Sequence, residues 1–332
     1  MSYERGIAAI RLESPAVIPH TQYISHPRLV EMLGDRLDLD FIFSTDGPEV
    51  KGRLTNMGHA FWNEDWSDYN TNYCYPFATP EEVLSFDPVA EYGLPDINAK
   101  AEEYQARWKQ GQANCDAVLP GGLYRTLFSF AIASFGWDMF LTAVGLDEER
   151  FEKVLEGFYQ IIMAHTQAWA KTDIEVFLTH DDMVWTEGAI FHPKWYRSHV
   201  FPRYRRYWEV VRDAGKKVLF CSDGDYTEFV DDLVAAGAQG FIFEPLTSLE
   251  YIVPRYGQTH VIIGNADTRI LTFGTKGAIR DEVKRCMELG RDCPGYFFAV
   301  GNHIPHNVPV ENALECFEAY WEMRYRKAPT VA

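Results

Sequence analysis

The sequence predicts an α/β fold, and within that class a single (β/α)8 barrel. Short apolar segments recur in its second half with helical segments between them, as expected of buried parallel strands. Polar residues follow each apolar segment directly. Because the active site of such a barrel is built at the carboxyl ends of its strands, these polar residues are predicted to meet at one mouth. The composition does not change along the 332 residues, so one domain over 1–332 is expected.

The five strands of the second half are predicted at 175–179, 217–220, 240–243, 260–264 and 296–300. The polar residues that follow them are His180 to Asp182, Cys221 to Asp223, Glu244, Asn265 to Asp267, and Gly301 to His303. The intervening helices are amphipathic. One of them carries an apolar face that includes Tyr204 and Trp208, with Arg203 predicted on the opposite face.

The first half is predicted to begin the barrel and to add an elaboration. Expected strands are 16–20, 41–46 and 114–119, and expected helices are 3–12, 27–33, 96–112, 128–135, 137–144 and 147–171. Residues 48–95 are rich in Gly, Pro, Asn and aromatic residues, which favours a hairpin or loop elaboration on the barrel.

Charge and cysteine usage exclude several classes of protein. The formal net charge of −17 disfavours nucleic acid or an anionic membrane as the main partner. No apolar run approaches 18 residues, and the N-terminus has no apolar signal core. The 6 cysteines form no CxxC pair, so we expect reduced thiols and a cytoplasmic protein. The sequence leaves a homodimer open.

Cys221 and Asp223 are the first site residues that the pattern indicates. They lie two residues apart on an extended segment, so both side chains are predicted on one face, where they could bind one ion. The alternative is structural: Cys221 is a small buried apolar residue, and Asp223 caps the following helix.

The polar residues of the mouth are typical ligands of a borderline-soft cation. Zinc accepts thiolate, imidazole and carboxylate together, and a divalent cation would relieve repulsion among gathered carboxylates. The predicted ligands are Cys221, Asp223, Glu244 and His303. The alternative is a set of capping and ion-pairing residues. Asp46, Cys74 and Cys115 form a competing set, weakened because Cys115 is expected at the far end of the barrel.

Aromatic residues are frequent, at 15% of the chain. Phe61, Trp62 and Tyr73 could line a flat apolar pocket, and Trp185 and His180 are further candidates for binding a substrate. The alternative is a satellite core under a hairpin. The sequence lacks GxGxxG after a strand, GxxxxGK[ST], HExxH and GxSxG, so dinucleotide, nucleotide, zincin and α/β-hydrolase functions have no signature.

A series of motifs in fixed order resembles the uroporphyrinogen decarboxylase superfamily. The motifs are Asp181-Asp182, 191–197, 221–224, 243–245, 264–269, 272–274, 301–305 and 308–312, with 4–6 through Pro19 resembling the family's opening helix and first strand. The resemblance implies a (β/α)8 barrel. The superfamily holds porphyrinogen decarboxylases and zinc-dependent methyltransferases that work with corrinoid cofactors.

The resemblance favours the methyltransferase branch. The decarboxylases bind a highly anionic tetrapyrrole with N-terminal arginines, whereas this chain has no arginine cluster after Pro19. Thiol methyltransferases carry His-x-Cys where this chain has Cys221 and Asp223, and a further Cys near Asn302 and His303. These departures resemble the first methyltransferase of corrinoid-dependent O-demethylase systems. A harder zinc site would polarise an aryl methyl ether, and the methyl group would pass to cobalt(I) of a corrinoid protein.

This branch implies Asp182, Asp223 and His303 as catalytic residues. Two other functions stay open. One is a decarboxylase without a cofactor, in which Asp182 or Asp223 handles the proton. The other is a barrel that only binds a small ligand. Within the methyltransferase branch, a methylcobamide:thiol methyltransferase is a further alternative.

Overall fold

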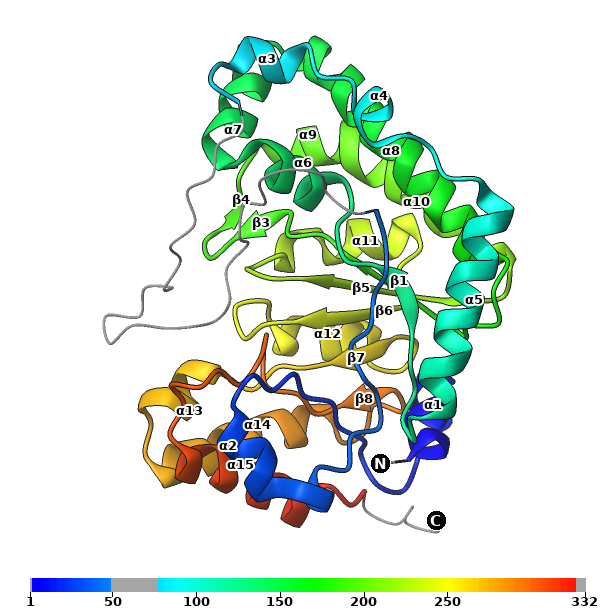
Figure 1. Ribbon diagram of the computed structural model, residues 1–332. Coiled ribbons are helices and arrows are strands. Elements are labelled where there is room, and N and C mark those ends of the chain that lie inside the picture. Colours follow the sequence, from blue (N-terminus) through cyan, green and yellow to red (C-terminus); the bar gives the residue numbers. More distant parts are fainter. Residues whose placement is uncertain (1, 49–76, 327–332) are drawn as a thin grey trace.

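The computed structural model describes residues 2–48 and 77–326 and has an α/β architecture with a parallel sheet (Figure 1). Six strands pair in the order β1-β2-β5-β6-β7-β8, and all five pairs are parallel. The strands of this sheet are β1 (Gly121–Leu123), β2 (Val176–His180), β5 (Lys217–Ser222), β6 (Gly240–Phe243), β7 (Val261–Ile263) and β8 (Tyr296–Phe297). The α/β prediction is therefore confirmed.

Helices precede the sheet and follow its strands, as the alternating pattern predicts. Those of the first half are α1 (Tyr3–Ile10), α2 (Pro27–Leu33), η1 (Gly34–Arg36), α3 (Pro80–Leu84), α4 (Pro88–Tyr92), α5 (Ile97–Ala113), α6 (Leu127–Phe135), α7 (Trp137–Leu146) and α8 (Glu148–Ala170). Those of the second half are α9 (Pro193–Trp195), η2 (Tyr196–Val200), α10 (Phe201–Asp213), η3 (Thr227–Phe229), α11 (Val230–Ala236), α12 (Leu249–Tyr256), α13 (Thr268–Phe273), α14 (Lys276–Gly290) and α15 (Val310–Met323).

Two extended segments lie beside the sheet without forming continuous strands. The Phe298 amide donates to the Pro19 carbonyl at 2.9 Å, and the Asp40 amide donates to the His20 carbonyl at 3.0 Å. The Ile42 amide then donates to the Val118 carbonyl, also at 3.0 Å. The predicted strands 16–20 and 41–46 are thus reduced to isolated bridges, at Val17 and His20 in the first and at Phe41 in the second. The closed eight-stranded barrel stays a prediction.

Some first-half predictions are wrong in position or missing. The strand predicted at 114–119 begins instead at Gly121, because α5 continues to Ala113 and only Val118 forms a bridge before β1. Helices α3 and α4 were not predicted from the sequence. The two-stranded pair of β3 (Val184–Trp185) and β4 (Gly188–Ala189) was not predicted either. The hairpin predicted within 48–95 lies largely outside the described residues.

Strand register sets which residues share the functional edge. His180, the last residue of β2, pairs with Cys221, and Cys221 pairs with Ile242 of β6. The residues that follow these positions therefore leave the sheet at one edge. Asp182, Asp223 and Glu244 come from three adjacent strand ends, as the sequence pattern predicts.

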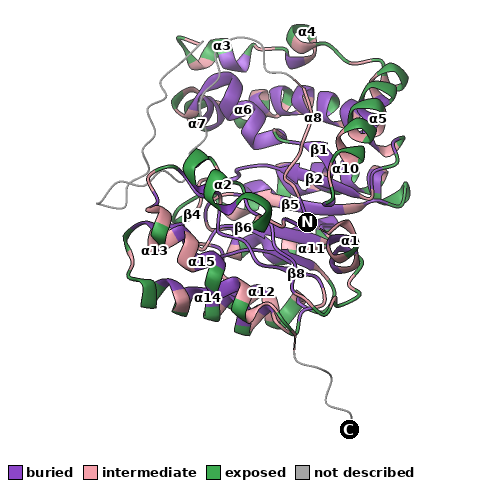
Figure 2. Cartoon of the chain, turned by 60° about the horizontal axis from the view of Figure 1, so that its bottom comes forward, coloured by how far each residue is buried: buried purple, intermediate pink, exposed green. Residues whose placement is uncertain are grey.

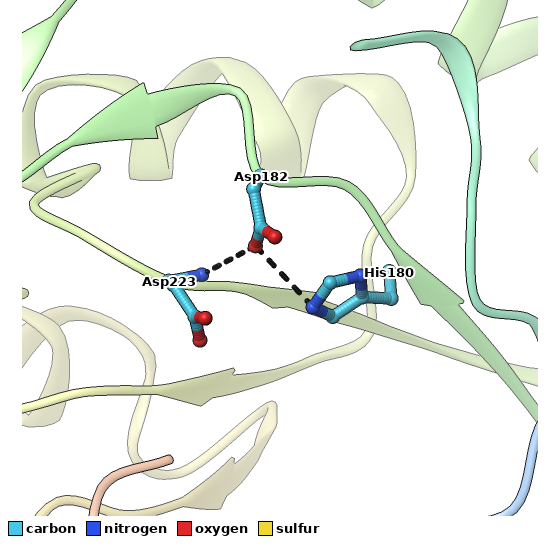
Figure 3. A group of neighbouring side chains, drawn as sticks. All are labelled: His180, Asp182 and Asp223. Carbon is cyan, nitrogen blue, oxygen red and sulfur yellow. Dashed lines mark hydrogen bonds and ion pairs between the residues drawn. The ribbon is translucent and has the colours of Figure 1, made fainter. Parts of the chain in front are cut away.

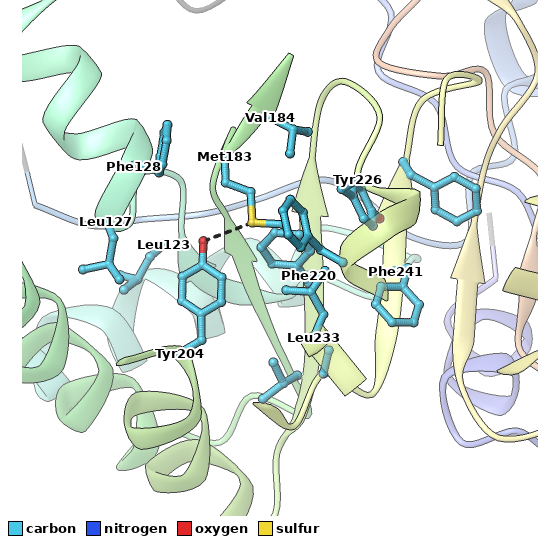
Figure 4. Packing of buried hydrophobic residues seen from close by; sticks show 14 of the residues in the cluster. Leu123, Leu127, Phe128, Met183, Val184, Tyr204, Phe220, Tyr226, Leu233 and Phe241 are labelled. Atoms are coloured by element: carbon cyan, nitrogen blue, oxygen red, sulfur yellow. Dashed lines mark hydrogen bonds between the residues drawn. The ribbon is translucent and has the colours of Figure 1, made fainter. Parts of the chain in front are cut away.

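The core lies between the sheet and its covering helices. Figure 4 shows Tyr204 and Leu233 packed with the strand residues Phe220 and Phe241, all fully buried. Arg203 was predicted on the exposed face of α10, and that prediction is wrong. Its side chain is buried and forms ion pairs with Glu152 and Glu156 of α8.

Burial follows the layers of the fold. In Figure 2 most of the six-stranded sheet and α6 are coloured as buried, whereas the outer sides of α5 and α14 are exposed. No single helix among the described residues is long and apolar enough to cross a membrane. The pair α6 and α7 passes on length and composition but is bent by 110°, and every residue of α6 is buried.

Candidate active site

A pocket of about 320 Å³ opens at the carboxyl ends of the strands. Its floor is apolar, with Leu178 of β2, Ile242 of β6 and Ile263 of β7. The remaining residues that line it are Tyr23, Phe43, Ser44, Thr45, Tyr124, His180, Cys221, Ser222, Asp223, Phe243, Glu244, Ala299, Val300, Asn302 and His303. None of these described lining residues is Arg or Lys, whereas several carry acidic, thiol or imidazole groups.

His180, Asp182 and Asp223 form a compact group (Figure 3). His180 and Asp223 line the pocket, and Asp182 contacts both of them. One ligand atom from each residue lies within 4.8 Å of the other two. The Asp182 Oδ1 lies 3.3 Å from His180 Nε2 and accepts a 2.9 Å hydrogen bond from the Asp223 amide. Among the described residues, this is the group of His, Cys, Asp and Glu side chains close enough to hold one metal ion.

The hydrogen bonds of His180 determine which of its nitrogens can bind a cation. Nδ1 lies 2.8 Å from the carbonyl oxygen of Tyr124, which can only accept, so Nδ1 carries a proton. In the neutral imidazole, Nε2 then presents a lone pair toward the Asp182 carboxylate. Two lone pairs facing each other in a buried wall need a proton or a metal ion between them. A second ring nitrogen held by a backbone carbonyl is also the usual arrangement of a metal-binding histidine.

Asp181 has a different role from Asp182. Its Oδ1 accepts the Ser129 amide at 2.6 Å, and its Oδ2 accepts the Phe128 amide at 3.1 Å and the Tyr204 hydroxyl at 2.5 Å. Burial raises the pKa of Asp181, and these three hydrogen bonds counteract part of that effect. Asp181 thus anchors the first turn of α6 and does not line the pocket, although the sequence analysis grouped it with the mouth.

The Ser129 side chain links the two aspartates. Its Oγ accepts a hydrogen bond from the Asp182 amide at 2.8 Å, while its own amide donates to Asp181. Because side chains alternate along an extended chain, His180 and Asp182 point to one side and Asp181 to the other. The start of α6 therefore fixes the backbone that holds Asp182 against His180 and Asp223.

The predicted ligands Cys221, Asp223, Glu244 and His303 all line this pocket. Only Asp223 belongs to the compact group, so the four-residue zinc set stays a prediction. Burial raises the pKa of the Cys221 thiol well above its ordinary value, and the carboxylates of Asp223, Asp182 and Glu244 raise it further. Without a cation, the Cys221 thiol is therefore protonated.

Glu244 and His303 are held by neighbouring loops. The Glu244 Oε2 accepts the Gly224 amide at 2.9 Å. The His303 Nδ1 lies 2.7 Å from Asn302 Oδ1, and the Asn302 amide group donates to Asp223 Oδ2 at 2.9 Å. The ring of Tyr23 packs near His303, with ring centroids 5.6 Å apart.

Tyr124 and Asn302 line the pocket but were not predicted as site residues. Tyr124 stacks on His180, with ring centroids 4.5 Å apart and ring planes 5° apart. Burial raises the pKa of Tyr124, and the nearby Asp182 and Asp223 raise it further. Tyr124 directly follows β1, so the rule about strand ends could have identified it. Asn302 was present in a predicted polar segment but was not chosen as a site residue.

The remaining predicted site residues are not part of this wall. Trp185 lies on β3, is 52% exposed and does not line the pocket. Phe61, Trp62, Tyr73 and Cys74 lie outside the described residues. In the competing set, Asp46 forms an ion pair with Arg107, and Cys115 follows α5 near the start of the β1 segment.

Comparison with known proteins identifies a related family. A family model described as uroporphyrinogen decarboxylase (URO-D) matches residues 125–323. The uroporphyrinogen decarboxylase of Syntrophotalea carbinolica is 27% identical over 197 residues, which is 58% of this chain and 55% of that protein. That of Carboxydothermus hydrogenoformans is 27% identical over 177 residues, 53% of this chain and 47% of that protein. The chain thus spans about half the length of these curated relatives.

A solved structure has a similar fold over nearly the whole chain. A methyltransferase from Methanosarcina mazei superposes with a TM-score of 0.62 at 15% identity, covering 97% of this chain and 99% of that one. At this identity the similarity concerns the fold. The chemistry must be argued from the pocket.

Proposed function

Because this chain belongs to the uroporphyrinogen decarboxylase family, we propose that it is the methyltransferase form of that fold, a zinc-dependent enzyme that demethylates a methoxylated aromatic compound. The methyl acceptor is the cobalt(I) of a corrinoid carried by a partner protein. One observation carries the proposal: the pocket combines a cation-binding wall with an apolar floor and has no Arg or Lys among its described lining residues.

The lining of the pocket supports a small, weakly charged substrate. A volume of about 320 Å³ is at the small end of the range for ligand pockets, roughly 300 to 1,000 Å³. A highly anionic substrate would face Asp223 and Glu244 in a pocket whose described lining residues include no Arg or Lys. An aryl ring instead fits against the apolar floor of Leu178, Ile242 and Ile263.

The donor atoms fit zinc. His180 offers Nε2, because its Nδ1 is engaged by the Tyr124 carbonyl, and Asp182 and Asp223 offer carboxylate oxygens. Cys221, Glu244 and His303 line the same pocket and remain predicted ligands. When bound, zinc would act as a Lewis acid on the ether oxygen of the substrate.

The reaction breaks one bond and forms one bond. The bond between the methyl carbon and the ether oxygen breaks, and its electron pair leaves with the oxygen as phenolate. Cobalt(I) supplies the electron pair for the new bond to the methyl carbon. The phenolate then takes up one proton from solvent and leaves as phenol, and His303 stays a predicted zinc ligand. The Asp182 and Asp223 carboxylates would bind the zinc ion and balance its positive charge.

A coupled assay tests this proposal. The protein, loaded with zinc, is mixed with the reduced corrinoid protein encoded beside it and a panel of methoxybenzenes. We expect methylcobalt absorbance and an equal amount of phenol. Asp223→Asn should lose this activity, because it removes a carboxylate from the metal group. Asp225→Asn is the matched control, since the Asp225 side chain accepts a local hydrogen bond from the Thr227 amide. No methyl transfer across the panel with zinc present would contradict the proposal.

Decarboxylation of a porphyrinogen is the second candidate, and the names of the curated relatives favour it. The two functions differ in their need for metal and in their substrates. Incubation with uroporphyrinogen should give no coproporphyrinogen, because the described pocket wall is acidic. Product formation by chelator-treated protein would instead establish the decarboxylase.

A further inference from the structure

We propose that Asn302 is a positioning residue that fixes the tautomer of His303 and couples this histidine to the metal group across the pocket. Asn302 lies between the two. Its Nδ2 is 2.9 Å from Asp223 Oδ2, and its Oδ1 is 2.7 Å from His303 Nδ1. Asn302 therefore connects the strand end of β5 with the segment after β8.

The chemistry of the three groups permits one assignment of hydrogens. A carboxylate accepts hydrogen bonds only, so the amide nitrogen of Asn302 must face Asp223. Its carbonyl oxygen then faces His303, and this oxygen can only accept. The His303 Nδ1 must therefore carry a proton, and in the neutral ring the lone pair belongs to Nε2.

The backbone keeps Asn302 in this position. Asn302 has a φ of 60°, a left-handed conformation that asparagine tolerates better than most side chains. Gly301, just before it, packs closely: a Cβ there would lie 2.4 Å from Pro245 Cδ and 3.1 Å from Glu244 Cα. The Gly301 carbonyl also accepts the Thr268 hydroxyl at 2.7 Å. The turn is thus fixed before any substrate or metal arrives.

An amide is suited to this bridge because it presents a donor and an acceptor together. Aspartate at this position would keep an acceptor for His303 but would face Asp223 with a second carboxylate. Glycine would accept the left-handed backbone and remove both hydrogen bonds. These two substitutions therefore separate the backbone role of Asn302 from its two side-chain roles.

The test reads the tautomer of His303 by nitrogen NMR in metal-free protein labelled with ¹⁵N-histidine. The chain has 10 histidines, and the spectrum of His303→Gln assigns the signal. At about pH 8.5, well above the ordinary histidine pKa of roughly 6.5, we expect the proton on Nδ1 in the natural protein. Asn302→Asp should keep Nδ1 protonated, whereas Asn302→Gly should lose this preference.

A proton on Nε2 in the natural protein would overturn the proposal, and so would an unchanged tautomer in Asn302→Gly. The natural protein alone decides the first outcome, even if a variant does not fold. Zinc titration gives a second measurement. Asn302→Gly should bind zinc about 10- to 100-fold more weakly, and an unchanged zinc affinity would contradict the coupling of His303 to the metal group through Asn302. The link to catalysis rests on the proposed function, but neither measurement needs a methyl donor, so the two can fail separately.

Discussion

Asp181 and Asp182 are adjacent in the sequence, yet their side chains serve two different regions of the molecule. Asp181 lies in a buried network under α6, where three donors surround its carboxylate. Asp182 belongs to the compact metal group beside the pocket, where its Oδ1 contacts His180 Nε2 and the Asp223 amide. The difference teaches that the Asp181 carboxylate is held by three donors of α6 and α10. The metal group instead brings two carboxylates and an imidazole together beside a pocket whose described lining residues include no Arg or Lys.

The largest expected effect comes from Asp181→Asn. The amide would place an NH₂ group against donors that now have an acceptor, so the start of α6 would lose its anchor. We expect the free energy of unfolding to fall by roughly 4 kcal/mol, as for the loss of several hydrogen bonds to a buried charge. Denaturant unfolding measures this. Asp182→Asn should change the free energy of unfolding by less than about 1 kcal/mol. Equal losses of stability in both variants would contradict the different roles of Asp181 and Asp182.

The next effect concerns pH and the buried region. Burial lowers the pKa of His20 to about 3, and its ring lies against Tyr320 with ring centroids 4.5 Å apart. In the unfolded chain this pKa is about 6.5. As the pH falls below about 6.5, the unfolded state binds a proton that the native state does not. Stability is therefore fully present above that pH and falls by roughly 1.4 kcal/mol per pH unit below it, down to about pH 3.

Denaturant unfolding between about pH 7 and pH 4 checks this slope. His20→Leu should reduce it. His165, whose pKa burial lowers to about 4, should account for part of the slope that remains. An identical slope in His20→Leu would show that His20 does not contribute.

The smallest effect separates two aromatic side chains near the mouth. Tyr124 stacks on His180 inside the pocket, whereas Trp185 is half exposed on β3. Tyr124→Ala should weaken zinc binding about 3- to 10-fold, as expected for loss of a ring contact of roughly 0.5 to 1.5 kcal/mol. Trp185→Ala should leave zinc affinity within about 2-fold. Titration of both variants with zinc measures this. A larger effect in Trp185→Ala than in Tyr124→Ala would show that Trp185, not Tyr124, supports the metal group.

The sequence predicted the functional edge of the sheet, because strand ends and the polar residues that follow them are local features. His180, Asp182 and Asp223 were all named in advance, and alternation along the strand already places the first two on one side. The family resemblance agreed with the later family match. Local patterns therefore carry most of the α/β fold.

The sequence could not predict which polar residues meet. The role of Asp181 depends on α6 beginning exactly where its backbone amides reach the carboxylate, a tertiary relation that no spacing rule contains. Asn302, in a left-handed turn, donates to Asp223, which lies 79 positions away in the sequence. Arg203 was predicted on the exposed face of α10 because its side chain is charged. Its side chain is instead buried, because it forms ion pairs with Glu152 and Glu156 of α8.

Zinc titration of the natural protein beside Asp182→Asn tests the central claim most directly. Calorimetry after removal of all metal gives both stoichiometry and affinity. We predict one zinc ion per chain in the natural protein and affinity at least about 10-fold weaker in Asp182→Asn, with Asp225→Asn unchanged. No zinc binding to the natural protein, or equal affinity in Asp182→Asn, would contradict a metal site built on His180, Asp182 and Asp223.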